Sequence, residues 1–300
     1  MHHFRFLSRL LNRPQMIAPA AGAAVLAALM PGADLRGYDG DADAAEHNPR
    51  AYGVTNGIAV IPIVGKLVHR GASMDAISGL ASYQALADMV SDALSDRKVT
   101  SILLDVDSPG GEAGGCLDFA EWLGQQRGTK PMWASVNQQA CSAAYAIASA
   151  TDRILIGQDA VAGSIGVAWY HTDLSEALRK EGVKVTFLYR GERKLAGNSA
   201  LPMSQEDVAM IDRTVELSYA RFCNLVARHR GLSAEAVQGT EAGIFQGSDA
   251  IAAGLADEIA TQEEALMALA SQIAPTGARM NSPATRAALL AGVGAGAVLA

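Results

Sequence analysis

Sequence patterns that mark several large classes of protein are missing from this chain. Its three cysteines, Cys116, Cys141 and Cys223, are scattered and form no CxxC pair. This usage is typical of reduced thiols and argues against a cysteine zinc site. The six histidines include no HExxH-type pair, which argues against a metal hydrolase. We therefore expect neither a metal nor another cofactor.

Positive charge is scarce as well. The 24 lysines and arginines are outnumbered by 31 aspartates and glutamates, so the formal net charge is −7. An acidic chain without a basic block lacks the attraction to phosphate on which nucleic-acid binding depends, and we expect no nucleic-acid partner. Half of the residues are hydrophobic and 18% are charged, a composition that excludes a disordered chain and predicts a buried core.

The apolar run from Met16 to Met30 is too short to span a membrane. It has 15 residues, and Pro19 and Gly22 interrupt it, whereas a spanning helix needs roughly 20 apolar residues. Arginines precede the run, so a signal peptide or a short anchor stays the alternative. We interpret it as an alanine-rich amphipathic segment used for packing or partner contact, and we expect no insertion into a membrane.

Polar segments divide the chain into three parts. Residues 34–50 are rich in Asp with Gly and Pro, and residues 274–283 carry Pro, Gly and Ser. Such segments are typical of linkers. We predict an N-terminal extension and linker over 1–50, a main domain over 51–273 and a small-residue C-terminal tail over 274–300.

Within the main domain, β-rich runs alternate with helical patterns. Strands are predicted over residues 57–64, 101–107, 132–136, 153–156, 165–170 and 183–189. Helices are predicted over 114–127, over 174–181 with Asp173 as the cap, and from Ser204 to Gly231. This alternation predicts a layered α/β domain with buried, mostly parallel strands.

The first segment with chemical potential is DSPGG at residues 107–111, directly after a hydrophobic strand. Two consecutive glycines leave the backbone N–H groups bare. Such a turn can bind a phosphate or can form an oxyanion hole for acyl transfer. Taken alone, it is also typical of an ordinary turn between a strand and a helix.

The second segment, QACSAAY at residues 139–145, joins a strand to a helix of small residues. Ser142 lies where this helix begins, so it is either a nucleophile or an N-cap serine. The flanking alanines leave room for a substrate backbone. Cys141 is the rival nucleophile, and we rank it lower because no histidine is placed to activate it.

The third segment is the polar loop GERKLAGN at residues 191–198, which contains Lys194. An exposed lysine usually has no chemical role. A lysine becomes a general base only where burial or cationic neighbours lower its pKa. Arg193 is such a neighbour in the sequence.

Together the segments resemble, in order and spacing, the signal-peptide-peptidase-A-like serine peptidases of the Clp protease/crotonase fold superfamily. The resemblance extends from about residue 57 to residue 259. It rests on SPGG at 108–111, CSAAY at 141–145, GSIGV at 163–167, Lys194 at 52 residues after Ser142, and GSDAIAAGLADEI at 247–259. It implies a Clp protease/crotonase-like α/β fold with helical N- and C-terminal extensions and a serine peptidase domain over 51–273.

The resemblance also implies a mechanism based on a Ser-Lys dyad. Lys194 would take the proton of Ser142, which would attack a peptide carbonyl and form an acyl-enzyme. The backbone N–H groups of Gly111 and Ala143 would hold the developing oxyanion. Ser164 would hydrogen-bond the lysine amine and orient it.

Among these peptidases, the chain is most similar to tailed-phage head-maturation proteases of the minor capsid protein C type. The loop GERKLAGN resembles their GKxKxxGN pattern, and it departs from that pattern at Glu192 and Ala196. The similarity implies capsid, scaffold or portal proteins as substrates. It also implies a homo-oligomer that acts in the host cytoplasm, on the procapsid or virion, without a membrane.

Four alternatives stay open at this point. The chain can be a bacterial inner-membrane signal peptide peptidase with residues 16–30 as its anchor, or a capsid-assembly protein without catalysis. A crotonase-type acyl-CoA enzyme would share the fold and would use a carboxylate such as Glu112. Within a peptidase, His171 and Asp173 would form a triad with Ser142, although Asp173 is better explained as a helix cap.

Overall fold

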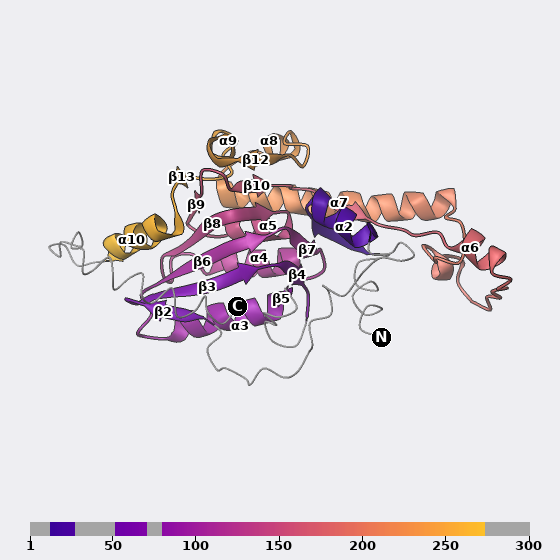
Figure 1. Cartoon of the computed structure of the whole chain (residues 1–300), viewed down its shortest axis with the longest axis horizontal. Helices are drawn as coiled ribbons and strands as arrows, with labels where there is room; N and C mark the ends of the chain where they lie inside the picture. Colours follow the sequence, from indigo (N-terminus) through magenta and orange to yellow (C-terminus); the bar gives the residue numbers. More distant parts are fainter. Residues whose placement is uncertain (1–12, 28–51, 71–79, 274–300) are drawn as a thin grey trace.

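A computed structural model describes residues 13–27, 52–70 and 80–273 of the chain. The predicted linker over 34–50 and the C-terminal tail over 274–300 lie outside the described residues. Figure 1 shows a layered body of strands and helices, with one long helix that extends beyond the body toward a small distal unit. We call this distal unit, residues 170–204, the arm.

The larger sheet is mostly parallel, as predicted. Its strands within the described residues are β2 (Gly53–Thr55), β3 (Ile58–Val64), β6 (Ser101–Ser108), β8 (Met132–Cys141), β9 (Arg153–Ile156), β10 (Val161–Gly163), β12 (Ile244–Gln246) and β13 (Glu258–Ile259). The order is β12-β10-β8-β6-β3-β2, and β9 lies between β8 and β13. Both β2 and β12 pair antiparallel with their neighbours, while the remaining pairs are parallel.

A second, smaller sheet stands beside the carboxyl ends of β3 and β6. It consists of β1 (Pro14–Ile17), β4 (Lys66–Val68), β5 (Leu80–Ser82), β7 (Gly110–Glu112) and β11 (Ala168–Trp169), in the order β11-β1-β7-β4-β5. The apolar run predicted as one segment over 16–30 is therefore divided. Met16 and Ile17 belong to a buried strand, and the helix α2 (Pro19–Ala27) follows.

Helices cover both faces of the larger sheet. They are α3 (Tyr83–Ser95), α4 (Cys116–Gln125), α5 (Ala143–Ser149), α8 (Ala234–Gln238), α9 (Gly247–Ala252) and α10 (Gln262–Ile273). Along β6, Ile102 and Leu104 belong to the main core, whereas Leu103 belongs to a second cluster with α10. Because successive side chains of a strand face opposite sides, this burial on both faces explains why three consecutive residues, Ile102, Leu103 and Leu104, are apolar. None of the helices in the described ranges is long and apolar enough to cross a bilayer.

The long helix α7 (Gln205–Arg230) has the predicted ends. The Ser204 side chain accepts a hydrogen bond from the Asp207 N–H at 3.0 Å, and Gly231 ends the helix with φ of +67°. Its apolar stripe is only partly covered, because Phe222 is fully buried while the side chain of Val208 is 50% exposed. The C-terminal half of α7 therefore packs on the body, and the N-terminal half leads into the arm (Figure 1).

The prediction of a strand over residues 183–189 is wrong. These residues form no strand and lie in the arm between α6 (Ser175–Lys180) and a short 3₁₀ helix, η2 (Glu192–Leu195). Leu188 is 94% exposed. The two sides of the arm meet where the Leu174 N–H donates to the Ser199 carbonyl at 2.7 Å. The alternating apolar pattern is that of a strand, but no strand among residues 13–27, 52–70 and 80–273 pairs with it.

A half-buried hydrogen-bond network closes the C-terminal end of α5. Arg127 donates to the carbonyls of Ser149 at 2.7 Å and Ala150 at 2.8 Å. The His229 Nδ1 atom lies 3.1 Å from the Ser149 hydroxyl. Burial, assisted by the charges of Arg127 and Arg228, lowers the pKa of His229 from 6.5 to about 4. The imidazole is therefore neutral in the folded protein at neutral pH.

This neutral histidine makes the stability depend on pH. The unfolded chain protonates His229 near pH 6.5 and the folded chain near pH 4, so its stabilising contribution is complete above pH 6.5 and is lost as the pH falls toward 4. We expect wild type to lose about 2 kcal/mol more unfolding free energy between pH 7.5 and 4.5 than His229→Asn does, after allowance for partial exposure. Urea unfolding at both pH values measures this difference, and equal losses would contradict it.

Candidate active site

Ser142 occupies a strained turn between β8 and α5. Its φ of +56° and ψ of −116° are uncommon for a residue with a side chain, and such conformations cluster at functional sites. The Ser142 N–H donates to the Gly163 carbonyl at 2.8 Å, and its Oγ donates to the Gly166 carbonyl at 3.4 Å. The hydroxyl makes no capping bond to α5. The reading of Ser142 as an ordinary N-cap serine is therefore not supported.

The glycine turn lies against the backbone on both sides of this serine. Gly110 has φ of +94°, and a Cβ atom there would lie 2.8 Å from the Cys141 carbonyl oxygen and 3.0 Å from the Ala143 nitrogen. A Cβ atom at Gly111 would lie 1.9 Å from the Leu67 carbonyl oxygen. Side chains at either position would push the segments apart, so both glycines are needed for the close approach.

The two groups predicted for the oxyanion hole take different places. The Ala143 N–H belongs to the first turn of α5, next to Ser142 and beside Gly110. Gly111 lies in β7 and pairs with Met16 of β1 and Leu67 of β4. Gly110, which we did not select from the sequence, is thus the glycine nearer to the serine turn. Its position as the first glycine after Pro109 is a signal that was available in the sequence.

The lysine predicted for the dyad lies outside this cluster. Lys194 is exposed on η2, and no hydrogen bond or ion pair joins it to Ser142 among the described residues. Figure 1 places the neighbouring helix α6 at the distal end of the molecule, far from α5. Ser164, in contrast, is buried in the body, where its carbonyl accepts from the N–H of Gly166 at 2.9 Å. The structure therefore brings Ser142 and the Ser164 loop together and leaves Lys194 on the arm.

The rival groups have structural explanations. Burial raises the pKa of the Cys141 thiol to about 11, so the reactive thiolate is scarce at neutral pH. Asp173 is exposed and accepts from the Ser175 N–H at 2.8 Å at the start of α6. Glu112 is buried, and one of its carboxylate oxygens accepts from the His69 N–H at 2.8 Å. No cluster of three or more His, Cys, Asp or Glu side chains suited to a metal ion occurs in the described ranges.

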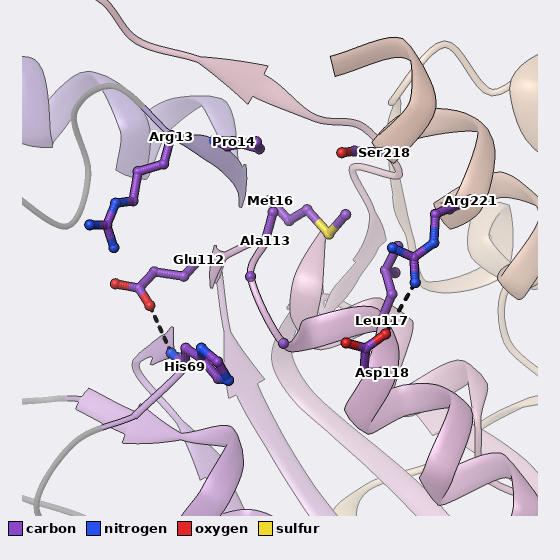
Figure 2. Close-up of a pocket in the computed structure, with 12 residues that line it drawn as sticks. Arg13, Pro14, Met16, His69, Glu112, Ala113, Leu117, Asp118, Ser218 and Arg221 are labelled. Atoms are coloured by element: carbon purple, nitrogen blue, oxygen red, sulfur yellow. Dashed lines mark hydrogen bonds and ion pairs between the residues drawn. The ribbon is translucent and has the colours of Figure 1, made fainter. Parts of the chain in front are cut away.

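A cavity of about 380 Å³ lies beside β1 and the glycine turn (Figure 2). Its walls come from β1, the residues after β4, the start of α4 and the middle of α7. They are Arg13, Pro14, Met16, His69, Glu112, Ala113, Gly114, Gly115, Leu117, Asp118, Ser218 and Arg221. The cavity mixes apolar walls with side chains of both signs of charge.

The buried thiol gives a direct test of the rival nucleophile. With a pKa of about 11, the Cys141 thiolate fraction at pH 8 is on the order of one in a thousand. We expect iodoacetamide to modify Cys141 at least about 100-fold more slowly in the native protein than in urea-unfolded protein. Peptide mass spectrometry over time measures both rates, and rapid native modification would favour Cys141.

Sequence comparisons identify relatives of this chain. Residues 125–274 match the profile of peptidase family S49. The chain is 40% identical over 224 residues to the Head-tail preconnector protein GP5 of Enterobacteria phage P21, covering 75% of this chain and 45% of that protein. It is 38% identical over 224 residues to the Capsid assembly protease C of Escherichia phage lambda, covering 75% and 51%. It is 31% identical over 227 residues to Protease 4 of Haemophilus influenzae, covering 75% and 35%. The chain spans about half the length of the two phage relatives.

Proposed function

This chain belongs to peptidase family S49, and on that premise we propose that it is a serine endopeptidase with a Ser-Lys dyad. The observation that carries the proposal is the turn at Ser142. There a buried serine, 1% exposed, is held at positive φ against a glycine turn, and its hydroxyl does not cap the helix. No helix-capping bond of the Ser142 side chain accounts for this strained backbone conformation. Strained residues cluster at functional sites, which supports a chemical role for Ser142.

The proposed reaction proceeds through an acyl-enzyme. Ser142 Oγ bonds to the substrate carbonyl carbon, and its proton passes to the neutral amine of Lys194. The oxyanion that forms is stabilised by the Ala143 N–H and by the glycine turn at Gly110 and Gly111. Breaking the C–N bond transfers the proton from the lysine to the leaving amine, and water then hydrolyses the ester. Ser164 acts as a positioning residue for the lysine.

We further propose that a second copy of the chain supplies the lysine. Lys194 is on the exposed arm, and the same arm presents Leu188, Tyr189 and Val185 to solvent. Apolar side chains gathered on a projecting unit are typical of a surface that is covered in an assembly. If the arm of each copy reaches the Ser142 turn of the next, the contacts close into a ring with cyclic symmetry. This arrangement supports the expected homo-oligomer.

The proposed role is head maturation in a phage or prophage. The two phage relatives, named for capsid assembly and for head-tail connection, support capsid, scaffold or portal proteins as substrates. They also support a location in the host cytoplasm on the assembling procapsid. A role as a membrane-associated signal peptide peptidase is the competing proposal, favoured by the likeness to Protease 4. Recovery of the expressed chain in carbonate-resistant membranes would favour that alternative.

Exchange of subunits tests both the dyad and its division between copies. We expect Ser142→Ala and Lys194→Ala each to abolish cleavage of a capsid or scaffold substrate while remaining folded. Cys141→Ala is the matched control and should keep its activity. Mixing the two inactive variants should restore activity to about a quarter of the wild-type level, because random assembly pairs an intact serine with an intact lysine at that share of interfaces.

The outcomes of this experiment are separable. An active Ser142→Ala variant would overturn the serine mechanism. Two inactive variants that stay inactive after mixing, under conditions where light scattering shows subunit exchange, would instead place both dyad residues in one copy. A chain that remains monomeric while active would overturn the ring. A catalytically inert wild type, tested on the same substrates, would favour a capsid-assembly protein without catalysis.

A further inference from the structure

The N-terminal strand β1 fills the space between the two segments that border Ser142. On one side it pairs antiparallel with β7 of the glycine turn, with Met16 opposite Gly111 and Ile17 opposite Gly110. On the other side it pairs antiparallel with β11, which follows the Ser164 loop, with Gln15 opposite Ala168. A strand held on both edges by main-chain pairing is the way in which extended peptides bind to sheets.

This strand lies against Gly110, the same glycine that touches the backbone of the serine turn. The Met16 carbonyl oxygen lies 2.2 Å from the position that a Cβ atom would take at Gly110, and the Ala143 nitrogen lies 3.0 Å from the same point. The Ala18 N–H donates to the Pro109 carbonyl at 2.8 Å. Met16, Ile17 and Ala18 are all buried. The strand therefore lies buried along the glycine turn that borders the serine turn, where an extended substrate would have to pair in order to reach Ser142.

The direction of β1 is that of a substrate. Its chain runs from Glu112 toward Pro109, so its C-terminal end lies beside Gly110, which borders the serine turn. An acyl donor must also place the residues before its scissile bond between β7 and β11 and bring its carbonyl to the serine. After Ala18, however, the chain turns at Pro19 into α2 and does not continue as an extended strand. Proline also lacks the N–H of an ordinary leaving amide.

The space between β7 and β11 favours a basic side chain at the end where β1 begins. The Glu112 carboxylate is buried beside the cavity, and its Oε1 atom has no hydrogen-bond partner among the described residues. Figure 2 shows the Arg13 side chain extending toward Glu112 without an ion pair between them. A buried carboxylate with a free oxygen is matched by a cationic side chain that can reach it.

We propose that the groove between β7 and β11 binds peptides as extended strands, and that residues 13–18 are its resident occupant, which closes the site until it is displaced. The fitting ligand carries a basic residue at the position of Arg13, aliphatic residues at those of Met16 and Ile17, and a small residue at that of Ala18. This inference deepens the proposed peptidase function and rests on it for the identity of the groove as a substrate site.

Binding of a synthetic peptide tests the proposal without catalysis. The probe is a fluorescein-labelled peptide with the sequence of residues 13–21, and the protein is the full chain carrying Ser142→Ala. Adding Met16→Asp should drive β1 out of the groove, since burying an unpaired charge is costly. We expect the peptide to bind this double variant at least about tenfold more tightly than Ser142→Ala alone, because the tethered occupant reduces the open fraction.

Matched controls exclude a general loosening of the fold. Met267→Asp places the same charge at a partly buried methionine in α10, away from the groove, and should not raise peptide binding. Ile17→Ala is a milder second variant, to be used if circular dichroism shows that Met16→Asp is unfolded, and it should raise binding to a smaller extent. Equal peptide affinity with and without the β1 substitutions would overturn the proposal.

The charge preference has its own control. Glu112→Gln in the double variant should weaken the peptide by about threefold, and a peptide with alanine in place of the arginine should show no such loss. A separate reaction tests the peptidase function: a fluorophosphonate should label Ser142 about tenfold faster in Met16→Asp than in wild type. If no protein is labelled but the peptide binds as expected, the serine chemistry fails and the occupied groove stands. If wild type and Met16→Asp are labelled equally fast, the serine chemistry stands and the closed groove fails.

Discussion

Direct backbone contact at Gly110 and Gly111 is the constraint on which the geometry around Ser142 depends. Four chain segments meet there: β1, β4, the end of β8 and the start of α5. A single methyl group at either glycine would meet a carbonyl oxygen at 1.9 to 2.2 Å. The small residues Ala143 and Ala144, both fully buried, extend this close packing into α5. The surroundings of Ser142 are therefore built largely from main-chain surfaces.

Hydrogen bonds to the C-terminal part of the domain hold α5, the helix that begins after Ser142, in place. Tyr145 Oη donates to the Leu255 carbonyl at 3.0 Å, and Asp257 accepts both from the Ile154 N–H at 2.6 Å and from Arg230 at 2.7 Å. The closing motif over residues 247–259 thus connects α5, β9 and the end of α7. Hydrogen bonds from Arg230 and Ile154 lower the pKa of Asp257 despite its burial. These bonds explain why a segment more than 100 residues after the serine belongs to the same structural unit.

Local patterns predicted the parts of the fold whose causes are local. The strand β6, with its three consecutive apolar residues, and the caps of α7 at Ser204 and Gly231 are each encoded by neighbouring residues, and the structure has them as predicted. Pairing partners are not encoded in this way. Residues 183–189 alternate like a strand but pair with no strand in the described part of the chain. Met16 and Ile17, in contrast, pair with Gly111 and Gly110, which lie more than 90 residues away in the sequence. The positive φ of Ser142 could not be predicted from the sequence either, because glycine is the residue that indicates this conformation.

A blocking strand that belongs to the same chain as its site competes with substrate differently from a free inhibitor. Tethering gives β1 an effective local concentration on the order of millimolar, so its contacts with β7 and β11 can be individually weak and still dominate in dilute solution. A competing chain prevails only where its own density approaches that value. At lower substrate densities the tethered strand keeps the site closed. Crowding by the substrate itself would then decide where the site opens.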